Sequence, residues 1–179
     1  MRIVTMAVLV MVLCGPIIYG AGSYQDEKVL DTVKIYEYYK DCVVDIKTTI
    51  EFDQEIFGIK TVTSGGTGFF LNKEGLVATV AHVVKDDDDK IEINSMFGST
   101  TLKIISYTYL VTLTSKNRKY KAVLVGADTF KDLALLKVLE IDPADYNAAK
   151  IDKTSVPKVG ESVCAIGMPY GLSNSLTAG

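Results

Sequence analysis

Apolar and polar side chains alternate along residues 44–53, and this two-residue period is what most limits the folds open to the chain. One parity carries Val44, Ile46, Ile50 and Phe52, and the other carries Asp45, Lys47, Thr49, Glu51 and Asp53. Such alternation is typical of an antiparallel strand with one face in the core and the other in water. Further short, β-branched segments between turn residues lie at 67–71, 76–80, 90–93, 104–114, 120–125, 133–139 and 162–166. The chain is therefore predicted to be all-β, a barrel or a sandwich, and a parallel α/β sheet does not fit.

Little of the sequence has a helical period. Residues 30–40 carry a partial apolar stripe that predicts one short helix. Residues 142–158 combine prolines and alanines with charges and have no strand pattern, which indicates a linker. A second unit is therefore expected from Val159, where about 20 residues are too few to bury a core alone. We expect this unit to be incomplete at Gly179.

An apolar run near the N-terminus predicts export. It follows Arg2 and precedes small residues at 20–23, the pattern of a secretory signal peptide over residues 1–22. The alternative is an uncleaved membrane anchor, which Pro16 disfavours. Either way the rest of the chain would face an oxidising compartment, in which Cys42 and Cys164 could pair. We favour two separate buried thiols, because each cysteine adjoins the apolar residues of a predicted strand.

The composition excludes several classes of function. There are 19 basic and 22 acidic side chains, and the net charge of -3 gives no electrostatic reason to expect nucleic acid as a partner. His82 is the single histidine, whereas a histidine-rich zinc or copper site needs several imidazoles. We expect neither a metal nor a cofactor. Any acid-base chemistry that requires an imidazole must use His82.

His82 and Asp132 are the candidate catalytic residues. His82 ends an apolar segment, where a hydrogen-bonded core histidine is the simpler interpretation of an isolated imidazole. Asp132, however, begins the apolar run 133–136, at the edge of a core where water is scarce and a carboxylate needs a hydrogen-bond donor. A carboxylate on one imidazole nitrogen leaves the other free to act as a general base. A serine late in the chain would complete such a triad.

Several blocks of sequence resemble one known family in the same order. They are Thr67-Gly68-Phe69-Phe70-Leu71 before Gly75, Ala81-His82-Val83-Val84, Val125-Gly126-Ala127-Asp128, Asp132-Leu133-Ala134-Leu135-Leu136-Lys137-Val138, and the stretch from Val159 to Leu172 with Leu176-Thr177-Ala178-Gly179. Together these blocks resemble the Deg/HtrA family of trypsin-like serine proteases over about residues 41–179. The agreement of several ordered blocks is far more specific than any single motif.

The resemblance implies a fold and a division of the chain. It implies a chymotrypsin-like double β-barrel in which the first barrel is complete and the second is truncated. Residues 23–40 would be an N-terminal segment, residues 41–141 the first barrel with His82 and Asp132, residues 142–158 the inter-barrel linker, and residues 159–179 the start of the second barrel. The active site would lie between the two barrels.

The resemblance also implies a function. The chain would come from an exported, periplasmic or secreted, serine endopeptidase that degrades unfolded or damaged proteins without ATP, or from a membrane-anchored form facing away from the cytoplasm. Its relatives usually form trimers and often carry PDZ domains. His82 would be the general base and Asp132 its orienting acid. The nucleophile would sit in a Gly-Asn-Ser-Gly-Gly motif that is absent from these 179 residues, so this chain alone is expected to be inactive. The alternative is a non-catalytic relative that binds or regulates polypeptides.

Other motifs have simpler interpretations. Ser64-Gly65-Gly66 looks like part of a nucleophile motif, but it precedes His82 and better fits a turn or a close backbone approach. The acidic run at residues 86–89 fits a solvated turn better than a calcium site, although it could raise the pKa of His82. Fifty residues separate His82 from Asp132, more than is typical of the family, which predicts an extra hairpin between Ile91 and Lys119.

Overall fold

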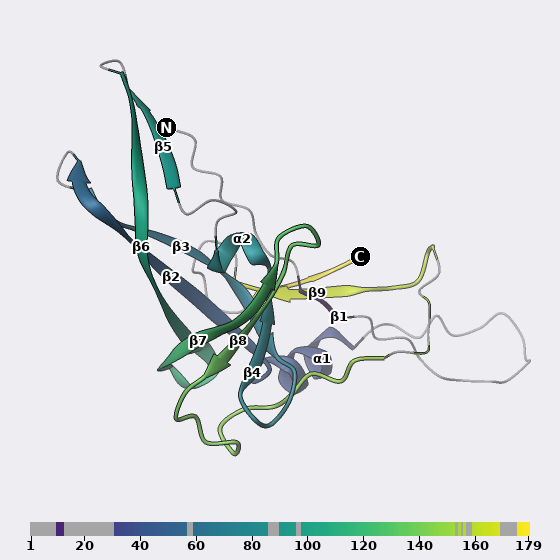
Figure 1. Cartoon of the computed structure of the whole chain (residues 1–179). Coiled ribbons are helices and arrows are strands. Elements are labelled where there is room, and N and C mark those ends of the chain that lie inside the picture. Colours follow the sequence, from purple (N-terminus) through teal and green to yellow (C-terminus); the bar gives the residue numbers. More distant parts are fainter. Residues whose placement is uncertain are drawn as a thin grey trace, which may run out of the picture.

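A closed ring of antiparallel strands forms the body of the protein (Figure 1). The computed structural model describes residues 10–12, 31–56, 59–85, 90–95, 98–152, 154, 156, 159–168 and 175–179. The barrel strands are β2 (Val43–Ile56), β3 (Ile59–Phe70), β4 (Leu76–Thr79), β6 (Gly98–Leu113), β7 (Arg118–Asp128) and β8 (Leu133–Val138). They follow the order β2-β3-β4-β8-β7-β6, and β6 pairs back onto β2 to close the barrel. Closure leaves the central strands without open edges.

The two faces of the segment at residues 44–53 are oriented as its alternating sequence predicts. Ile46 is opposite Gly66 on β3 and opposite Val111 on β6, so β2 lies between two neighbours. The residues of the apolar parity are all buried: Val44, Ile46, Ile50 and Phe52. Burial of these side chains stabilises the barrel at about 1.5–3 kcal/mol each.

A long hairpin occupies the interval in which extra chain was predicted. Strand β5 (Lys90–Ser95) pairs with the first part of β6 and lies outside the closed ring. The hairpin leads away from the barrel beside the connected ends of β2 and β3 (Figure 1). Leu102 and Ile104 of β6 are buried with Ile50 and Phe52, so apolar packing continues into this extension.

The glycines at 65, 66 and 68 lie inside β3, and those at 66 and 68 allow close packing. A Cβ atom on Gly66 would lie 2.5 Å from Cγ2 of Val83. One on Gly68 would lie 2.7 Å from Cδ1 of Ile46, 2.8 Å from Cγ1 of Val77 and 2.9 Å from the carbonyl oxygen of Ala78. Of the two roles predicted for Ser64-Gly65-Gly66, the close approach is therefore confirmed and the turn is wrong.

Replacing Gly68 with alanine is expected to lower the free energy of unfolding by about 1–3 kcal/mol, because the added methyl group meets both side chains and backbone. Urea unfolding of the 179-residue chain measures this loss. Gly126→Ala is the matched control, because a Cβ there meets nothing within 4 Å. Equal losses in the two variants would contradict the packing argument.

A small second sheet begins beyond the barrel. Strand β9 (Cys164–Gly167) pairs with β1 (Val10–Val12) on one side and with β10 (Ser175–Ala178) on the other. The sequence pattern predicted β9 but missed β10. Strand β1 falls in the predicted signal peptide, whose remaining residues, 1–9 and 13–22, lie outside the described part of the chain.

The second sheet contacts the barrel through helix α1 (Thr32–Tyr39) and the end of β3. Val43 is buried with Ile166 and Met168, and Ile35 and Tyr39 of α1 pack against this cluster. The backbone N–H of Met168 donates to Oγ1 of Thr67 at 3.0 Å. The helix predicted at residues 30–40 is thus confirmed in position.

Cys42 and Cys164 are both buried thiols in this structure, in agreement with the favoured interpretation. Burial raises the pKa of Cys42 to about 11, with a smaller contribution from the negative charge of Asp41. A thiol with so high a pKa is a poor nucleophile at neutral pH. Within the described residues, no helix has both the length and the apolar character needed to cross a membrane.

Candidate active site

His82 is placed at the surface by a single turn of helix. Helix α2 (Ala81–Val84) follows β4 directly, and its other three residues are buried. Val83 and Val84 belong to the barrel core, and the hydroxyl of Tyr109 donates to the carbonyl oxygen of Val84 at 3.0 Å. Burial raises the pKa of Tyr109 to about 12, so its hydroxyl keeps the proton it donates. With its neighbours fixed in the core, the imidazole of His82 faces outwards.

Asp132 lies in the turn that joins β7 to β8. Its backbone has a positive φ of 53°, which aspartate tolerates better than most residues. The turn is closed by two hydrogen bonds: the N–H of Asp132 donates to the carbonyl oxygen of Thr129 at 3.3 Å, and the N–H of Lys131 donates to Oδ1 of Asp128 at 3.0 Å. This geometry directs the Asp132 carboxylate towards α2.

Three hydrogen-bond contacts join His82 to Asp132, two from the ring and one from the backbone. Nδ1 of His82 lies 2.8 Å from Oδ2 of Asp132 and 3.0 Å from Oδ1, and the backbone N–H of His82 donates to Oδ1 at 3.0 Å. An ionised carboxylate only accepts hydrogen bonds, so the proton on a neutral imidazole resides on Nδ1. Nε2 is then the nitrogen left to accept a proton.

The environment of Asp132 favours its ionised form. Partial burial alone would raise the pKa of Asp132, but hydrogen bonds from the backbone and ring of His82 outweigh this effect. The nearby His82 charge and the backbone N–H of Ala81 act in the same direction, and the pKa of Asp132 falls below its ordinary value. The carboxylate is therefore ionised at neutral pH and can stabilise an imidazolium.

The predicted pair is brought together, but not in a dry environment. The side chain of His82 is 38% exposed and that of Asp132 is 41% exposed. This corrects both the expectation that Asp132 sits where water is scarce and the interpretation of His82 as a core histidine. The reason is local: Asp132 lies in the turn before β8, and burial begins only at Ala134.

The backbone donors to Asp132 were missed by sequence reasoning. The N–H groups of Ala81 and His82 are identical to those of any residue, and only the helical turn directs them at the carboxylate. The hydrogen bond from Tyr109 to Val84 was also missed, because the two residues are 25 positions apart and no local pattern links them.

Other candidate groups lie elsewhere. Ser64, Gly65 and Gly66 are interior residues of β3. The acidic run at residues 86–89 lies outside the described residues, so neither its calcium alternative nor its effect on His82 is tested. In the described ranges, no three His, Cys, Asp or Glu side chains are grouped so as to hold a metal ion.

Comparison with known proteins places this geometry in context. A family model described as a trypsin-like peptidase domain matches residues 66–179. The chain is 36% identical over 114 residues to a probable periplasmic serine endoprotease, DegP-like, of Halomonas elongata, which covers 64% of this chain and 19% of that protein. It is 32% identical over 136 residues to the mitochondrial serine protease HTRA2 of Drosophila ananassae, covering 76% of this chain and 27% of that protein.

The solved structure of the serine endoprotease from Yersinia pestis has a similar fold. It matches with a TM-score of 0.57 and 24% identity, over 86% of this chain and 44% of that one. The predicted all-β, chymotrypsin-like fold is thereby confirmed. The chain spans less than a third of the length of the two relatives described above.

Proposed function

This chain belongs to the trypsin-like peptidase family and is related to DegP-like and HTRA2 serine proteases, and from that premise we propose that it carries the His-Asp half of a serine endopeptidase site. The observation that supports this proposal most is the 2.8 Å contact between Nδ1 of His82 and Oδ2 of Asp132. His82 is then the general base, and Asp132 is the residue that orients it.

The proposed reaction assigns each proton. A serine Oγ attacks the carbonyl carbon of the peptide bond while its proton passes to Nε2 of His82. Asp132 stabilises the imidazolium that forms, and His82 then gives the proton to the leaving amine as the C–N bond breaks. In the second half, Nε2 of His82 takes a proton from water as the water oxygen attacks the acyl carbon. His82 then returns that proton to the serine Oγ as the acyl C–Oγ bond breaks.

We place the nucleophile outside these 179 residues. The Gly-Asn-Ser-Gly-Gly motif of the Deg/HtrA family does not occur in this sequence. In the proposed whole protein, a second barrel supplies this serine and the backbone N–H groups that stabilise the oxyanion. The half-exposed state of His82 and Asp132 fits a site that a second barrel covers.

The substrate and location are proposed from the relatives. One relative is described as periplasmic and another as mitochondrial, and the N-terminal apolar segment fits export. We therefore propose an exported endopeptidase that degrades unfolded or damaged proteins, with subunits assembled as a homotrimer.

The test is hydrolysis of casein by the protein encoded by the whole gene, compared with the 179-residue chain. The whole protein is expected to cleave casein and to be labelled at a serine by a fluorophosphonate, whereas the 179-residue chain should do neither. Reading the gene beyond the codon for Gly179 identifies the labelled serine. A whole protein that binds casein without cleavage or labelling would refute the peptidase and support the polypeptide-binding alternative.

A further inference from the structure

The segment after β8 is fastened to the barrel along its length. We call residues 142–150 the strap. The N–H of Asn147 donates to the carbonyl oxygen of Asp41 at 3.0 Å, and the N–H of Ala149 donates to that of Phe70 at 2.8 Å. These contacts join residues far apart in sequence, so the strap is docked onto the barrel although it has no helix or strand of its own.

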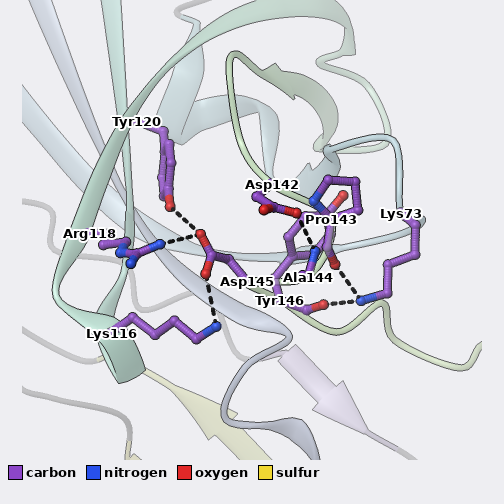
Figure 2. Close-up of polar contacts among 9 residues, drawn as sticks. All are labelled: Lys73, Lys116, Arg118, Tyr120, Asp142, Pro143, Ala144, Asp145 and Tyr146. Atoms are coloured by element: carbon purple, nitrogen blue, oxygen red, sulfur yellow. Dashed lines mark hydrogen bonds and ion pairs between the residues drawn. The ribbon is translucent and has the colours of Figure 1, made fainter.

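An aromatic side chain anchors the centre of the strap. Tyr146 is 1% exposed, and its ring stacks on Phe70 with 3.9 Å between centroids. Nζ of Lys73 donates to the carbonyl oxygens of Pro143 and Tyr146, and lies 5.0 Å from the Tyr146 ring centroid (Figure 2). Apolar packing and a cation thus hold the same short stretch.

A second anchor is electrostatic. The Asp145 carboxylate accepts hydrogen bonds from Lys116 at 3.1 Å, from Arg118, and from the hydroxyl of Tyr120 at 3.3 Å (Figure 2). These donors come from the η1 turn (Thr114–Lys116) and the start of β7. The Asp145 side chain is only 17% exposed, so its interactions are partly shielded from water.

The other carboxylate at the start of the strap behaves differently. Asp142 accepts a hydrogen bond from the N–H of Ala144, two residues along, at 2.8 Å. That bond shapes the strap locally. Asp145, by contrast, reaches a different part of the barrel, and the Lys116 bond lowers the pKa of Asp145 most, with Arg118 acting in the same direction.

The strap ends on the seam between the barrel and the second sheet. Its hydrogen bonds reach Asp41 and Phe70. The N–H of Phe70 donates to the carbonyl oxygen of Cys42 at 2.9 Å, and the next residue, Val43, packs against Ile166 and Met168. Detachment of the strap from the barrel would therefore increase the mobility of Val43 and its neighbours, against which β9 packs.

We propose that Asp145 is a positioning residue: with Lys116, Arg118 and Tyr120 it forms an electrostatic latch that keeps the strap docked and so fixes the second sheet against the barrel. The strap is part of the chain that connects β8, which starts directly after Asp132, to β9. Because Lys116 and Arg118 are partly exposed, high salt weakens the latch. Its importance for catalysis rests on the proposed function, but its role in docking does not.

The direct test is hydrogen exchange at the amides of Asn147 and Ala149 in the 179-residue chain. Asp145→Asn is expected to speed exchange at both amides about fivefold to tenfold, because local opening becomes easier. The amide of Val138, which bonds to the carbonyl oxygen of Gly75, should be unchanged. Asp142→Asn removes the same charge three residues earlier and serves as the matched control, with wild-type exchange expected.

A double-mutant cycle separates the latch from a general structural effect. Lys116→Met with Arg118→Met should reproduce the faster exchange, and Asp145→Asn should then add less than about twofold. Raising NaCl to 1 M should speed exchange in the wild type but not in Asp145→Asn. The latch is refuted if Asp145→Asn matches Asp142→Asn, or if its effect persists undiminished without the two cations.

The link between the latch and catalysis is tested in the whole protein. Asp145→Asn is expected to lower kcat/KM for casein about threefold to tenfold, since small displacements of catalytic groups are costly, whereas Asp142→Asn leaves it unchanged. If the wild type does not hydrolyse casein, the proposed function fails while the exchange result still decides the latch. Fast exchange together with unaltered kcat/KM would overturn the link to catalysis.

Discussion

Replacing His82 with alanine in the whole protein is expected to lower kcat for casein hydrolysis by about 10⁶-fold, because the imidazole placed to accept the serine proton is lost. Asp132→Asn is expected to lower the same kcat by about 10⁴-fold. An asparagine at 132 can still accept the backbone N–H of His82 through Oδ1. Its NH₂ group then faces Nδ1 and donates to it, which forces the imidazole proton onto Nε2 and blocks the general base.

Steady-state kinetics with a fluorogenic casein measures both losses, and circular dichroism checks that each variant folds. Asp128→Asn is the matched control, because this carboxylate lies in the same turn but bonds to the N–H and side chain of Lys131. It should change kcat less than about threefold. If kcat falls less than tenfold in both His82→Ala and Asp132→Asn, the two residues do not carry the reaction.

The barrel could be predicted from sequence because its strands have a local signature. The two-residue period from Val44 to Phe52 specifies which face is buried, and the structure buries that face. The predicted and observed strands differ most where this alternation is weak. Residues 60–64 of β3 are mostly exposed, so they carry no apolar parity. Of the two roles predicted for Gly65-Gly66, the turn was wrong because both residues lie inside the strand.

The pairing of His82 with Asp132 could be predicted from the sequence, but the solvent exposure of the two side chains could not. His82 and Asp132 are 50 residues apart, and their contact was predicted from the need of a carboxylate for a hydrogen-bond donor and from the ordered family blocks. Exposure depends on how the β7–β8 turn leaves the barrel, which is set by the positive φ of Asp132 and the hydrogen bond to Thr129. Backbone geometry of this kind leaves no mark on local composition, so the expected dry site was wrong.

The strap shows a further limit of sequence patterns. Prolines, alanines and charges in residues 142–158 indicate a linker, and nothing in that composition separates a docked segment from a free one. Tyr146 and Phe70 are far apart in sequence although their rings stack, and a single buried tyrosine has no period to detect. The same holds for the proposed Asp145 latch, whose donors Lys116, Arg118 and Tyr120 lie 25 to 29 residues earlier in the chain.

Tyr146→Ala is expected to lower the free energy of unfolding by about 3–5 kcal/mol, the range for removing a buried aromatic ring from a core. Tyr146 is among the largest fully buried side chains, and its loss leaves a cavity against Phe70 that neighbouring β-strands cannot fill. Urea unfolding of the 179-residue chain measures the loss. Tyr146→Phe retains the stacked ring and should cost about 1 kcal/mol or less. If alanine and phenylalanine cost the same small amount, the strap contributes little to the core, and its docking would have to depend on Asp145 and the backbone hydrogen bonds alone.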